Sequence, residues 1–195
     1  MKKWTPLFIV LGIIGLLVLF FSGSYNGLVS AEESVNQAWS QVENVYQRRM
    51  DLIPNLVETV KGYAAHELDT FRAVTEARSH AAGMISSDVV NDPAKFKAFQ
   101  ESQSQLSGAL SRLLVISENY PELKANQNFL SLQAQLEGTE NRISVERGRF
   151  NEAAQVFNVH VRRFPTNILA GMFGFKVKEY FKADAAAATA PKVQF

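Results

Sequence analysis

The histidines and their neighbours are the first residues in the sequence that could do chemistry. His66 and Glu67 begin like the helical zinc motif His-Glu-x-x-His, in which two imidazoles one turn apart bind the metal. Position 70 is Thr, so the second imidazole is missing, and His80 and His160 sit on other segments or another turn. We therefore expect His66 to lie on a solvated helix face, and we predict no metal site and no cofactor.

A second group of polar residues lies around a proline. Asp51, Asn55 and Glu58 follow one another at spacings of four and three, which puts them on one helix face within reach of Arg48 or Arg49. They could form a carboxylate–amide site. The alternative, which we favour, is that they close the backbone groups that a proline at position 54 frees within a helix.

Glu140 and Arg147 are charged residues on an otherwise apolar helix face, two turns apart. Buried polar groups need partners. We expect this pair to fix the register between neighbouring helices. The alternative is that the two residues line a groove for a partner.

Catalytic motifs are missing from the sequence. It has no cysteine and no Gly-x-Ser-x-Gly, Ser-x-x-Lys or glycine-rich phosphate loop. The formal net charge of +1 comes without a clustered basic excess, which argues against a nucleic-acid partner. We therefore expect no enzymatic activity, no nucleic-acid binding and no small-molecule substrate.

The N-terminal region reads as a membrane anchor. The run that begins at Leu7 and ends at Phe21 has no polar side chain, and its composition strongly favours insertion into a bilayer. Trp4 and Tyr25 flank the run as interfacial anchors. The residues between them span about 30 Å as a helix, which matches the hydrocarbon core. We predict that residues 1–25 cross the lipid bilayer once.

Flanking charges indicate the orientation of this anchor. Lys2 and Lys3 precede the run, and Glu32 and Glu33 follow it. The positive-inside rule then predicts a protein of the inner (cytoplasmic) membrane with a cytoplasmic N-terminus and an exported C-terminal domain. A cleaved signal peptide ending near Ala31 is the alternative, but that site lies ten residues beyond the apolar run.

Apolar residues at spacings of three and four predict helices over residues 26–165. One stripe runs from Val35 to Ala81, and we read Pro54 as a kink in this long helix, although Asp51 could instead cap a new one. Asp92 should cap a second long helix that ends near residue 120. Pro121 should open a third, which Pro165 stops. The predicted fold is all-α: a transmembrane helix followed by an elongated antiparallel bundle of four helical segments.

Residues 166–195 differ from the bundle in composition. Aromatic residues interleave with Lys176, Lys178 and Lys182, and an alanine-rich stretch follows. We favour a segment that caps the end of the bundle. A basic–aromatic strip on anionic headgroups is the alternative.

Several motifs, in order, resemble the LemA family of bacterial membrane proteins. The resemblance extends from about Tyr25 to Phe181 and implies a single-pass protein with a four-segment helical bundle, without an established enzymatic activity or cofactor. A magnetosome-associated branch of the family suggests a membrane-organising role, and genes often found beside membrane proteases hint at such partners. The residues that carry the motifs are Arg49, Asp51, Pro54, Asn55, Glu58, Lys61, Tyr63, His66 and Glu67, then Tyr120, Pro121, Lys124 and Asn126, then Phe150 and Asn151, then Phe164, Pro165 and Asn167, and finally Phe173 and Phe175.

These observations lead to one function and two alternatives. We expect a membrane-anchored scaffold or adaptor of the bacterial envelope, whose bundle contacts another envelope protein or a second copy of itself. A lipid-binding or membrane-organising protein is the alternative from a different class. An envelope hydrolase is the weakest reading, because it would need a pocket in which His, Asp and Ser side chains converge.

Overall fold

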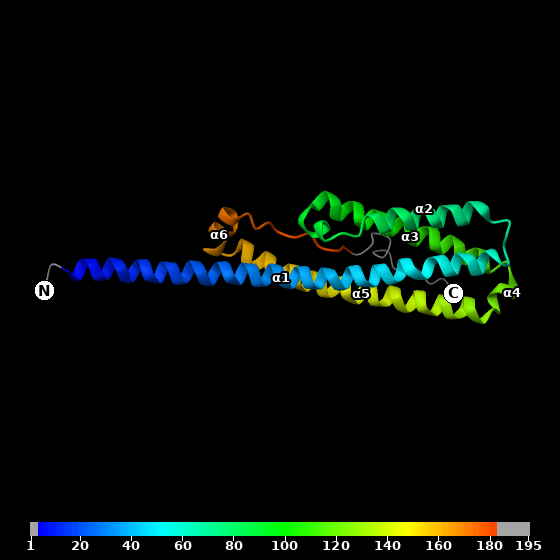
Figure 1. The fold of residues 1–195 in the computed structure, drawn as a ribbon, viewed down its shortest axis with the longest axis horizontal. Helices are drawn as coiled ribbons and strands as arrows, with labels where there is room; N and C mark the ends of the chain where they lie inside the picture. Colours follow the sequence, from blue (N-terminus) through cyan, green and yellow to red (C-terminus); the bar gives the residue numbers. More distant parts are fainter. Residues whose placement is uncertain (1–3, 183–195) are drawn as a thin grey trace, which may run out of the picture.

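The first helix joins the membrane segment to the bundle without a break. The computed structural model describes residues 4–182, and in it α1 (Thr5–Lys61) is a single helix of 57 residues. At 1.5 Å per residue, this helix is about 85 Å long. Within the described residues it is the one helix long and apolar enough to cross a membrane. Its apolar N-terminal part projects beyond the rest of the molecule (Figure 1).

Four long helices form an antiparallel bundle, as predicted. They are α1, α2 (Leu68–Gly83), α3 (Pro93–Ser117) and α5 (Gln127–Arg162), and they run alternately up and down (Figure 1). Short helices lie between and after them: η1 (Ser87–Asn91), α4 (Pro121–Lys124) and α6 (Thr166–Phe173). Residues 4–182 contain no strand, so the all-α fold class is confirmed.

The first predicted helix ends earlier than expected. The helix does continue through Pro54, but the chain reverses over residues 62–67, so a single helix from 35 to 81 was wrong. The amides of Tyr63 and Ala64 both donate to the carbonyl of Val60 and tighten the last turn. Ala64 and Phe71 remain buried in the same core as Val60. The helical spacing of apolar residues therefore continues across the turn, so the turn cannot be recognised from that spacing.

Side-chain caps define the later boundaries. Asp92 accepts hydrogen bonds from the amides of Ala94 and Lys95, and Pro93 opens α3, as predicted. The third long helix starts later than predicted. Pro121 opens only the single turn of α4, and Asn126 then caps α5 by accepting from the amides of Asn128 and Phe129.

The described part of the C-terminal tail is built into the core. After α6 the chain runs extended along the bundle (Figure 1), and Phe181 enters an aromatic cluster with Trp39, Phe96, Phe99 and Phe150. Rings in such clusters contribute about 0.5–1.5 kcal/mol per pair beyond their buried area. The tail as far as residue 182 is therefore part of the core of the bundle and does not only cap its end. The alanine-rich stretch lies outside the described residues.

Candidate functional site

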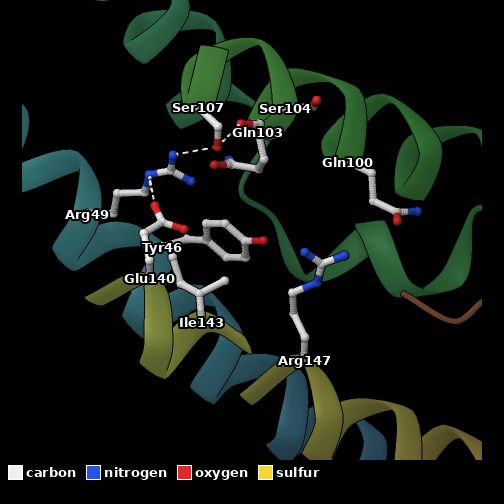
Figure 2. A pocket seen from close by; sticks show the side chains of 9 residues that line it. All are labelled: Tyr46, Arg49, Gln100, Gln103, Ser104, Ser107, Glu140, Ile143 and Arg147. Atoms are coloured by element: carbon white, nitrogen blue, oxygen red, sulfur yellow. Dashed lines mark hydrogen bonds and ion pairs between the residues drawn. The ribbon is translucent and has the colours of Figure 1, made fainter. Parts of the chain in front are cut away.

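A small polar pocket opens where α1, α3 and α5 meet (Figure 2). Its volume is about 130 Å³. The long helices bring to it residues that lie far apart in the sequence. Its lining consists of Tyr46 and Arg49 from α1, Gln100, Gln103, Ser104 and Ser107 from α3, and Glu140, Ile143 and Arg147 from α5.

Arg49 is the buried charge of this pocket. Its side chain is 3% exposed, and its Nε lies 2.8 Å from Oε1 of Glu140, which is 43% exposed. Its Nη2 also donates to the hydroxyl of Ser107 at 2.7 Å. Burial lowers the pKa of the Arg49 guanidinium from its ordinary value, and electrostatic interactions with Glu140 and Tyr46 oppose that shift. A guanidinium keeps its charge under these conditions. Arg49 therefore joins all three helices as a buried cation.

Gln103 brings an amide that none of the residues 4–182 satisfies. The residue is 5% exposed, and neither Nε2 nor Oε1 hydrogen-bonds to a described residue. In Figure 2 its side chain extends into the pocket beside Ser107. Buried polar groups without a partner are uncommon in proteins. The amide is thus a buried donor and acceptor that no described residue satisfies.

Arg147 lies on the other side of the pocket. Its guanidinium carbon is 4.6 Å from the ring centroid of Phe181, and its Nη2 donates to the carbonyl of Lys182 at 3.1 Å. The Glu140–Arg147 pair predicted from the sequence is thus divided. Glu140 contacts α1 through Arg49, whereas Arg147 holds the C-terminal tail. Both residues connect separate parts of the bundle.

The lining of this pocket consists mainly of hydrogen-bonding groups. Its lining offers two guanidinium groups, two amides, two serine hydroxyls and one carboxylate, and it contains no histidine to serve as a base for either serine. Such a set suits a small polar molecule that accepts several hydrogen bonds. The convergence of His, Asp and Ser that a hydrolase would need is not found among these lining residues.

The polar residues around Pro54 have a different role from the one predicted. Asp51, Asn55 and Glu58 are exposed and make local contacts: Asp51 accepts from Gln47, and Glu58 pairs with Lys61 at 2.8 Å. The side-chain hydroxyl of Thr59 donates to the carbonyl of Asn55. None of these contacts involves the carbonyl of Met50, which Pro54 deprives of its helical donor. That carbonyl accepts instead from Nε of Arg78 on α2, at 2.8 Å.

The motif residues of the two turns, from Tyr63 to Glu67 and from Tyr120 to Asn126, gather at the end of the bundle away from the apolar segment. Nδ2 of Asn126 donates to the hydroxyl of Tyr63 at 2.8 Å, which joins the α1–α2 turn to the start of α5. His66, Pro121 and Lys124 lie exposed in these two turns, and Glu67 and Tyr120 are half-buried there. We call this end, residues 62–67 and 118–126, the distal end. No group of three or more potential metal ligands occurs within the described residues.

A model of the LemA family matches residues 38–195, more than half of the chain. The chain belongs to the LemA family. The matched region begins beyond the apolar run and includes the whole pocket and the distal end. With its apolar N-terminal helix, this LemA-family chain is a membrane-associated protein.

Three curated relatives support this assignment. Magnetosome protein MamQ 2 of Paramagnetospirillum magneticum is 29% identical over 182 residues, covering 85% of this chain and 67% of its own length. MamQ of Magnetospirillum gryphiswaldense is 29% identical over 174 residues, covering 80% and 64%. Protein LemA of Metamycoplasma hominis is 26% identical over 169 residues, covering 87% and 73%. The present chain thus spans about two thirds of the length of the MamQ relatives. None of these names states a reaction.

Two asparagines of α5 hold the C-terminal tail, a role that was not predicted from the sequence. The side chain of Asn158 exchanges two hydrogen bonds with the backbone of Lys178, at 2.7 and 2.9 Å. Asn151 does the same with Phe181, at 2.9 Å each. Asn151 and Asn158 are seven residues, or about 10 Å, apart along the helix. Lys178 and Phe181 are three residues, or also about 10 Å, apart in the extended tail, so each asparagine lies opposite its partner. The sequence signal that could have indicated this role is the presence of two asparagines on the apolar face of α5.

Lys178 forms a buried ion pair that the basic–aromatic strip interpretation missed. Its side chain is 4% exposed, and its Nζ lies 2.7 Å from Oε1 of Glu32 and 2.6 Å from Oδ1 of Asn91. The ammonium also lies 5.1 Å from the ring centroid of Phe157. The side chains of Lys178 and Phe181 are therefore both buried in the bundle. The basic–aromatic segment cannot present all of its side chains to lipid headgroups.

Proposed function

We propose that this member of the LemA family is a membrane-anchored scaffold or adaptor of the bacterial envelope, which holds a binding surface at a fixed distance from the bilayer. One observation carries the proposal: α1 continues from its apolar run into the bundle as one helix. A flexible linker at that point would let the bundle tumble independently of the anchor. A continuous helix transmits the position and direction of the anchor to the bundle.

Contacts from the C-terminal region brace this helix just beyond the apolar run. Leu169 and Ala170 of α6 are buried against Leu28, and the ring of Phe173 packs against Tyr25 with 4.9 Å between centroids. The ion pair between Lys178 and Glu32 lies one to two turns farther along α1. These contacts support a rigid junction between anchor and bundle, as a scaffold needs.

The distal end is the proposed surface for a partner. From Tyr25 to Lys61 the helix spans about 54 Å, which sets the distance of this end from the membrane. Lys124, His66 and Pro121 are exposed there, whereas Asn126 and Tyr63 hold the two turns together. The proposed partner is another envelope protein or a second copy of this chain.

Crosslinking at native expression tests this role. A photoreactive amino acid at Lys124 should give a crosslinked product of defined mass, whereas the same group at Val145, exposed on the side of α5, should not. A mass of two chains would identify self-association, and another mass would identify an envelope partner. Monomer alone from Lys124 contradicts the scaffold proposal.

The proposed location is the inner membrane, with the N-terminus in the cytoplasm and the bundle exported. Lys2 and Lys3 before the apolar run support this orientation. The chain has no cysteine, so a Leu68→Cys variant carries a single thiol at an exposed distal position. A membrane-impermeant thiol reagent should label it in cells whose outer barrier has been opened. Labelling only after lysis contradicts the orientation.

A membrane-organising role is the second candidate. The relatives named as magnetosome proteins support it, and so does an exposed apolar helix beside the anchor.

A further inference from the structure

The bundle carries a second apolar surface, next to the membrane segment. Around α6, four large apolar side chains are between 55% and 76% exposed: Phe164, Ile168, Met172 and Phe173. The opposite side of the same helix is occupied, because Leu169 and Ala170 are buried against α1. We call the four exposed residues the α6 patch. Exposed apolar side chains clustered in this way mark a contact surface.

The α6 patch lies at the level where the apolar run ends. Phe173 packs on Tyr25, which is four residues, or about 6 Å, beyond Phe21 along α1. Tyr25 is also the residue at which a hydrocarbon core of about 30 Å, measured from Trp4, comes to its end. Figure 1 shows α6 beside α1 at the point where the anchor joins the bundle. The patch therefore lies at the height along α1 where the surface of a bilayer around the apolar run would be.

An open apolar hollow connects the two surfaces. It has a volume of about 320 Å³ and is lined by Phe21, Ser22 and Tyr25 of α1 and by Leu169, Met172 and Phe173 of α6. The α1 side of the hollow continues into the apolar run. A molecule that packs against the end of that run therefore also contacts α6. An acyl chain beside Phe21 would thus extend into contact with Met172.

Charges around the patch agree with an anionic headgroup layer. Arg162, Arg163 and Lys176 flank α6 and are exposed. The nearest acidic groups on α1, Glu32 and Glu33, lie about 10 Å farther from the bilayer than Tyr25, and Glu32 is paired with Lys178. Apolar side chains at the acyl boundary with cations beside them are the pattern of a helix that lies in a membrane interface.

We infer that α6 docks into the lipid interface of the membrane that α1 crosses. The occupant of the α6 patch is lipid: acyl chains contact Ile168, Met172 and Phe173, and anionic headgroups contact the flanking cations. The protein then meets the bilayer at two places, the span of α1 and the side of α6. This second contact fixes the tilt and rotation of the bundle, which a single helix leaves free. The inference rests on the anchoring role of α1 but not on a protein partner.

Site-directed fluorescence quenching tests this inference in the full chain. Single cysteines at Met172, Leu16 and Leu68, all strongly exposed, are labelled with an environment-sensitive fluorophore. Each variant is reconstituted at one copy per nanodisc, without spin-labelled lipid, with lipids that carry a spin label near the headgroup, or with lipids that carry it deep in the acyl chain, which is the label that reaches Leu16. The label at Leu16 reports insertion of α1, and the label at Leu68 reports the aqueous distal end. Quenching at Met172 should exceed quenching at Leu68 by about threefold or more, as for an interfacial helix.

Each outcome decides the inference. Quenching at Leu16 but only background at Met172 overturns the docking of α6 and leaves the anchor in place. Background at Leu16 shows that α1 is not inserted and removes both the anchor and this inference. Background quenching at Met172 in discs of one copy, with a change in its fluorescence only in discs of several copies, overturns the inference in favour of self-association through the α6 patch.

A paired set of substitutions adds a second test. The double variant Phe164→Ser, Ile168→Ser should at least halve the quenching at Met172, because it removes apolar contact while Leu169 and Ala170 still hold α6 on α1. The matched control is Val115→Ser, Val145→Ser, at exposed apolar positions of α3 and α5, and should leave the quenching unchanged. Equal effects of the two double variants contradict lipid contact at the α6 patch.

Discussion

Nε of Arg78 donates a hydrogen bond to the carbonyl oxygen of Met50, at 2.8 Å. This carbonyl lies four residues before Pro54, which has no backbone N–H to offer it. A side chain of α2 therefore supplies the donor that α1 lacks. The same hydrogen bond fixes the register of α2 against α1. The carbonyl that Pro54 leaves without a helical donor thus connects the two helices.

Arg78→Ala should lower the free energy of unfolding by about 1 kcal/mol, because it leaves the Met50 carbonyl without a donor. Thermal unfolding of the full chain in detergent, followed by circular dichroism, measures the loss. In a Pro54→Ala background the restored N–H satisfies the carbonyl, and Arg78→Ala should then cost less. Arg72→Ala, on the exposed face of α2, is the control. Equal losses of stability from Arg78→Ala in the native and the Pro54→Ala proteins would show that Arg78 does not compensate for the missing N–H of Pro54.

The sequence predicted those features of the fold that depend on local signals. Asp92 before Pro93 predicted the start of α3, because an aspartate cap and a proline in the first turn need no distant partner. The apolar periodicity likewise predicted the all-α bundle. The turn at residues 62–67 escaped detection because Tyr63 and Ala64 keep the helical spacing while the chain reverses.

The site was less predictable, since its contacts join distant helices. Glu140 was expected to need a partner, but only the packing of α1 on α5 identifies Arg49 as that partner. Nothing local distinguishes Gln103 from the other glutamines of α3, because its burial depends on how three helices meet. The capping segment that we favoured did not identify Lys178 as its buried residue, because the burial of Lys178 follows from the path of the tail.

Asn158→Ala should release the C-terminal tail from α5. It removes the groups that pair with both the amide and the carbonyl of Lys178. Hydrogen exchange measured by mass spectrometry should show faster exchange over residues 175–182, and stability should fall by about 1–2 kcal/mol. Asn167→Ala, at an exposed position of α6, should change neither. Unchanged protection of the tail in the Asn158 variant would show that Phe181 and Asn151 hold it unaided.

Glu32→Gln should destabilise the protein more than Lys178→Met. The first change leaves the Lys178 ammonium buried with only a neutral partner, at a cost of about 2 kcal/mol, whereas the second removes the charge and keeps an apolar stem against Phe157. Thermal unfolding compares the two variants, with Glu33→Gln at the exposed neighbouring position as control. A larger loss from Lys178→Met would mean that the ion pair itself stabilises the fold.

Gln103→Met separates the two roles open to the polar pocket. The Gln103 amide is buried and bonds to no described residue, so replacing it with a side chain of similar size removes the cost of burying an unpaired polar group. If the pocket only fills space between helices, this variant should be more stable than the native protein by about 1 kcal/mol. Gln100→Met, in the same lining but half-buried, should have little effect. A loss of stability confined to Gln103→Met would contradict this expectation. It would show that a polar guest satisfies the amide, and the nearby guanidinium of Arg49 would then be part of a binding site.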